Sequence, residues 1–262
     1  GEQVGKECNE LGVTGWYGPA MNIHRSAFSG RNFEYYSEDG TLSGFIGGNE
    51  VAGATEQGVM TYVKHFAMND QETNRTNGLC TWATEQSIRE IYLKGFEKSF
   101  KEGKSLAVMS SFNSIGARWA GNNTSLLQSV LRDEWGFVGM VITDYNGSYG
   151  YQTTDNCIKN GNDLMLGYGT AESNQLNTES ATTVLAMRQA SKNILYTIAN
   201  SGYYVDSSAA EISTDGLNKM QITFYTVDAI VVVIVLLAEA LVLIRFFLKR
   251  KKAAAKITVE KE

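Results

Sequence analysis

The chain has 262 residues, 43% of them hydrophobic, which is enough for a full core in one or two domains. Its net charge is −5, and the basic residues gather only near the C-terminus, which argues against nucleic-acid binding. The three cysteines lack the CxxC spacing of a zinc cluster, and only two histidines are present, so we expect neither a metal site nor a cofactor.

Apolar runs of strand length alternate with helical segments over residues 1–201. The five runs are Val13–Trp16, Tyr62–Phe66, Leu106–Phe112, Met140–Thr143 and Asp163–Leu166. From Ile88 to Phe100, apolar residues recur every three or four positions, which predicts a helix with one buried face. Strand and helix in alternation predict an α/β fold with a parallel sheet.

The number of strands predicts a partial (β/α)8 barrel of the TIM type. A closed barrel needs about 250 residues, whereas residues 1–201 supply about five strands. We therefore expect residues 1–201 to be the C-terminal portion of a barrel domain whose N-terminal strands are absent from this chain. The chain starts at Gly1 without an initiator methionine or a signal peptide, and we expect a missing N-terminal domain in the full-length protein.

The C-terminal part of the sequence predicts a membrane anchor. A polar linker at residues 202–224 precedes an apolar stretch at residues 225–248, and Ala229–Leu248 is about long enough to cross a hydrocarbon core. Glu239 costs about 3 kcal/mol there, but each of fifteen large apolar residues returns about 0.3 to 0.6 kcal/mol, so insertion is favoured. The alternative is a buried core helix, but a helix that is apolar on every face is difficult to place in a barrel.

Basic residues after the apolar stretch predict the orientation of this anchor. Residues 249–262 begin with Lys249, Arg250, Lys251 and Lys252. By the positive-inside rule this basic tail is cytoplasmic, and the barrel lies outside the cell. We expect a single-pass membrane protein that contacts membrane lipid through Ala229–Leu248 and has an extracellular catalytic part.

Polar residues stand at the carboxyl ends of three predicted strands. Lys64 and His65 end the second run, Ser-Phe-Asn at residues 111–113 ends the third, and Asp144 follows the fourth. Barrels present their reactive groups at the carboxyl ends of the strands, so Asp144 is a candidate for catalysis. An alternative role for Asp144 is to cap the turn that follows the strand.

A calcium loop is a second alternative for Asp144. Positions 1, 3, 5 and 12 of an EF-hand-like loop would be Asp144, Asn146, Ser148 and Asp155. Tyr149 stands where such a loop needs Gly, and a strand rather than a helix precedes it. We therefore reject the calcium interpretation.

Four segments of the chain carry a family resemblance. They are NIHRSAFSGRNFEYYSEDG (Asn22–Gly40), KHFAMNDQETNR (Lys64–Arg75), VMSSFN (Val108–Asn113) and LRDEWGFVGMVITDY (Leu131–Tyr145). In this order they closely resemble the barrel domain of glycoside hydrolase family 3, the retaining β-glucosidase type, and the similarity extends over about residues 1–201. The resemblance implies that Asp144 is the nucleophile of a covalent glycosyl intermediate, with Tyr145 beside it at the sugar.

The resemblance also implies that Arg31 and Arg75 bind sugar hydroxyls. Lys64 and His65 suit the same role as donors at a barrel mouth, because polar groups at a buried strand end need partners. Alternatively, both arginines only pair with neighbouring glutamates. The candidates for that pairing are Glu34, Glu38 and Glu72. Glu38 and Asp39 precede a helical segment, where we favour capping over catalysis.

Two departures from the family pattern bear on activity. Phe112 replaces the Tyr that most members have beside the nucleophile, and it leaves only a ring to contact the substrate. In most members the acid/base Glu comes from a second domain after the barrel, where this chain has a linker and a membrane helix. The acid/base is therefore unknown, and we expect it in the missing N-terminal part, as in members that place the second domain before the barrel.

The sequence thus predicts a retaining, exo-acting β-glycosidase at the cell surface that acts on a β-glucoside or oligosaccharide. Residues 67–70 replace the Gly-His-Gly loop of the members that cleave N-acetylglucosaminides, which favours glucosides or xylosides. Two alternatives remain open. One is a membrane-anchored carbohydrate-binding pseudoenzyme, suggested by Phe112 and the unknown acid; the other is a β-xylosidase or α-arabinosidase of the same family.

Overall fold

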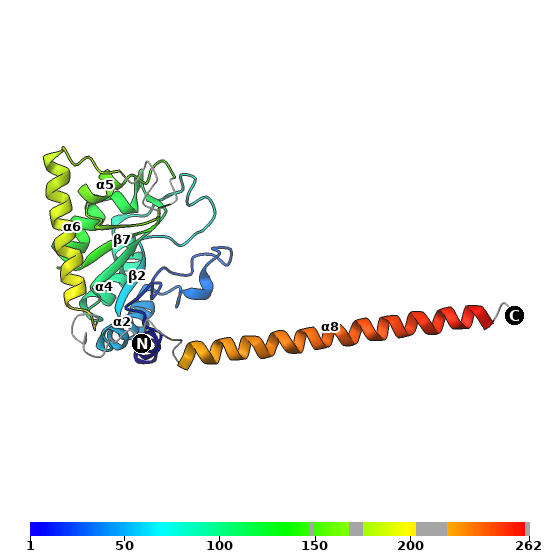
Figure 1. Ribbon diagram of the computed structural model, residues 1–262. Helices are drawn as coiled ribbons and strands as arrows, with labels where there is room; N and C mark the ends of the chain where they lie inside the picture. Colours follow the sequence, from blue (N-terminus) through cyan, green and yellow to red (C-terminus); the bar gives the residue numbers. More distant parts are fainter. Residues whose placement is uncertain (147–148, 168–174, 203–218, 260–262) are drawn as a thin grey trace. The chain divides into compact units, whose positions relative to one another are not determined.

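The computed structural model describes residues 1–146, 149–167, 175–202 and 219–259 of the chain. The chain divides into two units, Gly1–Ile212 and Ser213–Glu262. The described part of the first unit is an α/β domain, and that of the second is one long helix, α8 (Lys219–Val259) (Figure 1).

A five-stranded parallel sheet forms the centre of the first unit. In spatial order its strands are β1 (Gly15–Trp16), β2 (Met60–Phe66), β4 (Ala107–Ser110), β7 (Met140–Tyr145) and β8 (Leu164–Leu166). The order in space equals the order along the chain, as expected for successive βα units. The predicted α/β fold is confirmed, and a strand lies in each predicted run. In the described part of the chain the sheet is open, with β1 and β8 at its edges.

The strands are buried because their sequences are nearly continuous apolar runs. All four residues of β4 are buried, as are the first four of β7, from Met140 to Thr143. The run predicted from Leu106 to Phe112 is shorter as a strand and ends at Ser110. From there the chain turns into a second, smaller sheet.

Helical segments precede, connect and follow the strands. They are α1 (Glu2–Glu10), α2 (Gly40–Glu56), α3 (Glu85–Ser87), α4 (Lys94–Lys101), α5 (Thr154–Lys159) and α6 (Ala181–Ala199), the 3₁₀ segments η1 (Asn32–Glu34) and η3 (Ala120–Asn122), and the π-helical segments η2 (Ile88–Tyr92) and η4 (Ser125–Glu134). The helix predicted from Ile88 to Phe100 is thus built from two pieces, η2 and α4. Its buried face is narrower than predicted, since Phe96 and Phe100 are buried but the apolar residues of η2 are only partly buried.

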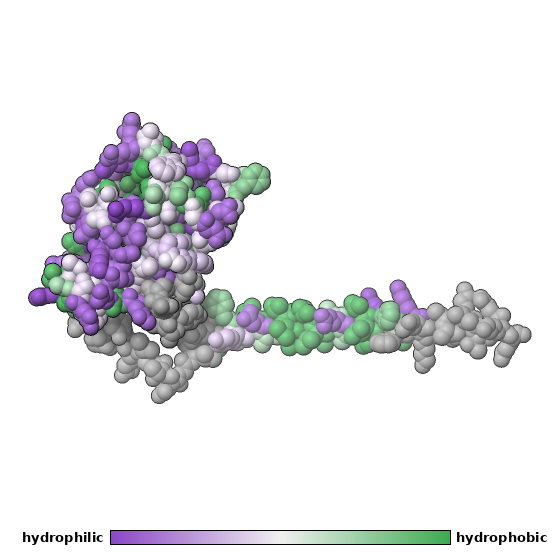
Figure 2. All heavy atoms as spheres, turned by 90° about the horizontal axis from the view of Figure 1, so that it is seen from above, coloured by the Kyte–Doolittle hydropathy of each residue, from purple (hydrophilic) through white to green (hydrophobic). Residues whose placement is uncertain are grey.

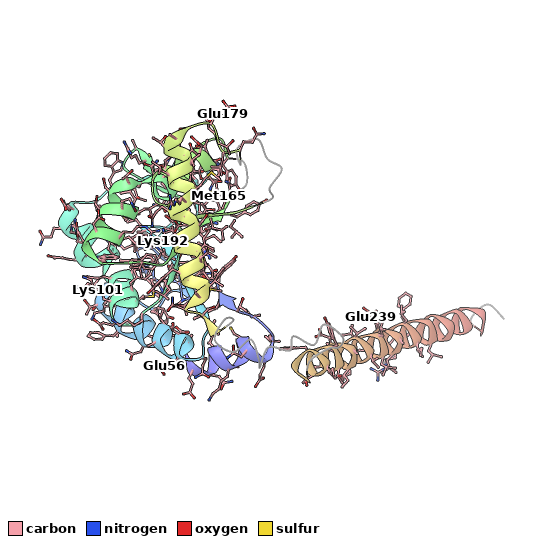
Figure 3. The ribbon with its side chains drawn as sticks, turned by 60° about the vertical axis from the view of Figure 1, so that its left-hand side comes forward. Glu56, Lys101, Met165, Glu179, Lys192 and Glu239 are labelled. Atoms are coloured by element: carbon pink, nitrogen blue, oxygen red, sulfur yellow. The ribbon has the colours of Figure 1, made fainter. Side chains whose placement is uncertain are left out.

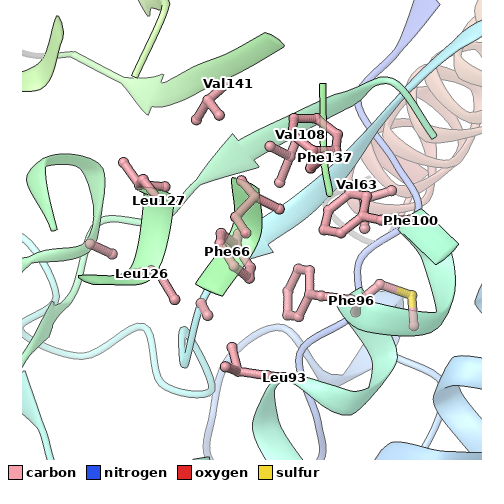
Figure 4. Packing of buried hydrophobic residues seen from close by; sticks show 14 of the residues in the cluster. Val63, Phe66, Leu93, Phe96, Phe100, Val108, Leu126, Leu127, Phe137 and Val141 are labelled. Atoms are coloured by element: carbon pink, nitrogen blue, oxygen red, sulfur yellow. The ribbon is translucent and has the colours of Figure 1, made fainter. Parts of the chain in front are cut away.

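Aromatic side chains fill the space between the sheet and these helices (Figure 4). Phe66, at the end of β2, packs edge-on against Phe96, with the ring centroids 5.1 Å apart. Phe100 in turn lies 5.0 Å from Phe137, which precedes β7. Burial of one Phe side chain contributes about 1.5 to 3 kcal/mol, so this cluster fixes the end of β2 against α4.

The connections after β2 and β4 meet in a second sheet of three short strands. They are β3 (Cys80–Thr81), β5 (Ser114–Ile115) and β6 (Arg118–Trp119). β3 pairs with β5 in parallel, and β5 pairs with β6 antiparallel. Strands of two residues have no periodic pattern, and for that reason the sequence did not predict them. The pairing joins two loops at the carboxyl ends of neighbouring strands.

Helix α8 contains a segment, Ile222–Phe246, that is long and apolar enough to cross a membrane. Figure 2 shows much of the helix as hydrophobic, with a few polar breaks. Glu239 lies within this segment (Figure 3). Length and composition therefore agree with the predicted anchor, although the helix extends beyond the predicted residues 225–248.

The predicted linker and tail are partly helical. Within the linker predicted at residues 202–224, the chain is helical from Lys219 onwards, and residues 203–218 lie outside the described residues. The tail predicted at residues 249–262 continues the same helix to Val259, and residues 260–262 again lie outside the described part.

Alanine substitutions at two glycines of α2 should have opposite effects on stability, one through a steric clash and the other through helix propensity. A Cβ at position 40 would lie 2.3 Å from the Ile91 carbonyl oxygen, whereas the nearest atom at position 48 is Lys98 O, at 3.5 Å. We expect Gly40→Ala to lower the free energy of unfolding by about 1 to 3 kcal/mol. Gly48→Ala should raise it, by up to about 1 kcal/mol, because Ala favours a helix. Circular dichroism during thermal unfolding measures both changes, and equal stabilities would contradict the close contact at position 40.

Candidate active site

The carboxyl ends of three neighbouring strands carry the residues predicted to form the site. His65 lies in β2, Phe112 follows β4, and Asp144 lies in β7. Because these strands are adjacent and parallel, the three residues reach one edge of the sheet. Arg75, from the loop after β2, reaches the same place, with its Nη1 atom 3.8 Å from Asp144 Oδ2.

Asp144 is a largely buried carboxylate, with 13% of its side chain exposed. Its Oδ1 atom accepts a hydrogen bond from Tyr145 N at 2.7 Å. Its Oδ2 atom is buried and has no hydrogen-bond partner among the described residues. Burial raises the pKa of Asp144, although the Tyr145 N–H and the charges of nearby cations oppose this rise. Oδ2 is thus a buried acceptor whose hydrogen-bonding capacity is unused among the described residues.

His65 lies against this oxygen as an uncharged ring. Its Nε2 atom is 3.6 Å from Asp144 Oδ2, which is too far for a hydrogen bond. Burial, together with the charges of three nearby cations, holds the pKa of His65 well below its usual value. The contact is therefore not an ion pair. Asn22, which the sequence did not single out, accepts from His65 N at 2.9 Å and donates to His65 O at 3.1 Å, so it fixes the backbone there.

A carboxylate and an aromatic ring hold Arg75 in place. Its Nε atom lies 3.0 Å from Glu72 Oε2, and its guanidinium lies over the ring of Phe112, 4.2 Å from the centroid. Such a cation–π contact contributes about 0.5 to 2 kcal/mol, depending on desolvation. Phe112 is buried, so here its ring supports Arg75, a role that the sequence did not indicate.

Arg31 and Lys64 join the same cluster through Glu34. The carboxylate of Glu34 accepts a hydrogen bond from Arg31 Nε, and its Oε2 atom lies 3.1 Å from Lys64 Nζ. Burial tends to raise the pKa of Glu34, but the two cations outweigh burial and lower the pKa. Arg31 Nη1 also lies 3.9 Å from Glu72 Oε1. Cations and carboxylates therefore alternate through the cluster as far as Asp144.

The glutamate pairing considered for the two arginines is present. Arg31 pairs with Glu34 and Arg75 pairs with Glu72, while Glu38 forms no ion pair within the described part of the chain. Pairing does not exclude a binding role, because Arg75 also faces Asp144. Asp39 caps α2 as predicted, since its Oδ1 atom accepts from the backbone N–H groups of residues 41 and 42.

Two tyrosines after the nucleophile candidate differ in their contacts. Tyr145 is 41% exposed, and its backbone N–H donates to Asp144. Tyr151, which the sequence analysis missed, donates its hydroxyl hydrogen to Phe112 O at 3.2 Å. Burial raises the pKa of Tyr151 to about 12, with smaller contributions from Tyr149 and Asp144. The only sequence signal for Tyr151 is an aromatic residue in the polar segment after the strand.

The described residues contain no cluster of metal ligands, and the two glutamates of the Asp144 cluster are paired with cations. Among them, no group of three or more His, Cys, Asp or Glu side chains could hold a metal ion. Of the rejected calcium loop, Ser148 lies outside the described residues, and the Asp155 carboxylate accepts from Lys159 and Thr183. Within the cluster, Glu34 and Glu72 each contact two basic side chains, so we assign both to bracing the cations.

Comparison with known proteins agrees with this arrangement. A family model described as the glycosyl hydrolase family 3 N terminal domain matches residues 1–166. Beta-glucosidase A of Butyrivibrio fibrisolvens is 40% identical over 168 residues, which cover 64% of this chain and 20% of that protein. A beta-glucosidase of Ruminococcus albus is 43% identical over 142 residues, which cover 54% of this chain and 15% of that protein. The chain thus spans a fifth or less of the length of these two relatives.

Solved structures of two beta-glucosidases are also similar to this chain. Beta-glucosidase 3B from Thermotoga neapolitana, in complex with glucose, has a TM-score of 0.67 and 38% identity, covering 78% of this chain and 30% of that one. The enzyme from Kluyveromyces marxianus, in complex with glucose, has a TM-score of 0.71 and 29% identity, covering 79% of this chain and 25% of that one. Because the family model matches more than half of the chain, this chain belongs to glycoside hydrolase family 3.

Proposed function

We propose that this chain is part of a retaining, exo-acting β-glucosidase and supplies its nucleophile, Asp144. The observation that carries the proposal is the Oδ2 atom of Asp144, which is buried, lacks a hydrogen-bond partner among the described residues and faces His65 and Arg75. Relatives named beta-glucosidase, and two structures of such enzymes with glucose, favour a glucoside as the substrate.

In the proposed reaction, Asp144 Oδ2 attacks the anomeric carbon of a terminal β-glucosyl residue. The bond from that carbon to the leaving oxygen breaks, an acid protonates this oxygen, and a glycosyl ester of Asp144 forms. Water then attacks the same carbon, its proton passes to the acid/base, and glucose leaves with its β configuration retained. The carboxylate of Asp144 is thereby restored.

Basic and aromatic residues around Asp144 hold the sugar in this proposal. Hydrogen bonds to the sugar hydroxyls come from Arg31, Lys64, His65 and Arg75. Tyr145 offers its half-exposed ring to the substrate, whereas Phe112 acts by keeping the guanidinium of Arg75 in place. Preorganised donors of this kind contribute most when they strengthen in the transition state.

The acid/base is proposed to lie in a part of the protein beyond this chain. A retaining enzyme needs its second carboxyl group about 5 to 5.5 Å from the nucleophile. The two carboxylates in the cluster, Glu34 and Glu72, already brace its cations. The segment that this chain matches covers only 20% and 15% of the two relatives, which leaves room for another domain.

We also propose that α8 anchors the protein in a membrane as a single span. The segment Ile222–Phe246 has the necessary length and apolar character. The basic cluster that begins at Lys249 lies only on its C-terminal side, so residues 249–262 face the cytoplasm and the hydrolase lies outside.

An activated fluoroglucoside should label Asp144. A dinitrophenyl 2-deoxy-2-fluoro-β-glucoside needs little help from an acid, because its leaving group is already stable. We therefore expect the 262-residue chain in detergent to form a stable ester, which peptide mass spectrometry maps to Asp144. Asp144→Asn should prevent labelling, whereas Asp155→Asn, a matched change outside the cluster, should not. A label on another carboxylate would sink the assignment, and no label at all would favour a carbohydrate-binding pseudoenzyme.

Asp144→Asn should raise the melting temperature at pH 7. Because the pKa of Asp144 is raised in the fold, its stabilising contribution is complete below the unfolded value of 3.8 and is lost as pH rises through the folded pKa. Asn imitates the uncharged carboxyl group and restores this contribution. Glu34→Gln is the matched control with the opposite sign, since the lowered pKa of Glu34 means that its charge stabilises the fold. The melting temperatures of both variants are measured by thermal unfolding at pH 7. A lower melting temperature for Asp144→Asn than for the parent chain would contradict this prediction.

Protease protection tests the membrane topology. Protease added to intact cells should digest the hydrolase unit but spare an epitope tag placed after Glu262, because the positive-inside rule puts the tail in the cytoplasm. A tag placed before Gly1 serves as the accessible control. Loss of both tags from intact cells would refute the orientation.

A further inference from the structure

A pocket with a volume of about 510 Å³ lies beside the loop that carries Arg75, apart from the Asp144 cluster. Residues 70, 71 and 73 of that loop line the pocket, whereas residues 72 and 75 of the same loop take part in the Asp144 cluster. None of Asp144, Arg75 and Lys64 lines the pocket. Its volume lies within the usual range for small-molecule sites, about 300 to 1,000 Å³.

Asp70 and Arg25 give this pocket complementary hydrogen-bonding groups. Asp70 Oδ1 accepts from Ile23 N at 2.6 Å, the single hydrogen bond found for this carboxylate among the described residues. Oδ2 therefore retains its capacity to accept from a ligand. The guanidinium of Arg25 lies over the ring of Tyr92, 5.5 Å from the centroid, and forms no ion pair in the described part of the chain. It offers donors that can complement the acceptor.

Two strongly exposed aromatic side chains stand at the same pocket. Phe28 is 91% exposed and Trp82 is 76% exposed. Trp82 directly follows β3, and its ring lies near Gly116, in the turn between β5 and β6. Large apolar rings left in water at one pocket indicate a surface that binds a partner.

We propose that this pocket is a second saccharide-binding site, separate from the Asp144 cluster. A saccharide presents hydroxyl groups to a carboxylate and a guanidinium, and its apolar C–H face packs on an aromatic ring. Since Asp70 and Arg25 carry opposite charges, the pocket suits a neutral ligand. A glucan chain bound here would be retained beside the proposed hydrolase site, so the inference extends the proposed function without needing Asp144 to react.

Titration with cellotriose tests this second site. Calorimetry is carried out on the full chain with Asp144→Asn, which excludes turnover. We expect Trp82→Ala in that background to weaken binding about tenfold, whereas Trp82→Phe, which keeps a ring, should retain most of the affinity. Asp70→Asn should weaken binding severalfold, because a carboxylate accepts more strongly than an amide. Phe45→Ala removes a half-exposed ring of α2 that does not line the pocket, and should change nothing.

The outcomes separate this inference from the proposed function. Cellotriose affinity that is unchanged by both Trp82→Ala and Asp70→Asn, or no binding at millimolar cellotriose, would overturn the second site. Trp82→Ala in the wild-type background should still be labelled at Asp144 by the fluoroglucoside, so the hydrolase proposal can survive that result. The opposite result is also informative. If the fluoroglucoside does not label Asp144 but cellotriose affinity still depends on Trp82, the saccharide site is supported and the hydrolase proposal is not. Circular dichroism of each variant must match that of the parent chain.

Discussion

Burial of the Asp144 carboxylate is the constraint on which the rest of the site depends. A charge removed from water needs compensation, and here the compensation comes from Arg75 and, at longer range, from Arg31 and Lys64. These cations are themselves largely shielded from water, so Glu34 and Glu72 brace them in turn. The compensation is incomplete, because the pKa of Asp144 remains raised. The charged carboxylate therefore lowers the stability of the fold. Groups that cost stability in this way are typical of functional sites.

The frame around this cluster keeps it rigid. Aromatic rings from β2 and α4 pack beneath the sheet. In addition, the buried carboxylate of Asp163 accepts from Arg132 Nη2 and Val141 N, both at 2.7 Å, and from Asn193 at 2.8 Å, which ties η4, β7 and α6 together. The strand that carries Asp144 is therefore fixed by packing and by hydrogen bonds, which keeps the carboxylate in one position; the proposed reaction would need little reorganisation there.

The loop after β2 connects the two sites of the domain. Some of its residues contact the Asp144 cluster, and others line the aromatic pocket. A backbone hydrogen bond joins this loop to the segment before η1, since Glu72 N donates to Ser29 O at 2.9 Å. The three-stranded sheet fixes its far end. A ligand in the pocket and a sugar at Asp144 would therefore contact one connected piece of structure.

The sequence alone determined the five strands of the sheet, because nearly continuous apolar runs in alternation with helices have few other solutions. It also placed Asp144, Lys64 and His65 at strand ends, since in a parallel sheet those ends meet at one edge. Only the tertiary structure decided which groups touch. Three features join segments that are distant in sequence: the hydrogen bonds between Asn22 and the backbone of His65, the contact of Arg75 with the ring of Phe112, and the pocket at Trp82. Such contacts depend on how the loops pack against one another, and this packing cannot be predicted from the local pattern of residues.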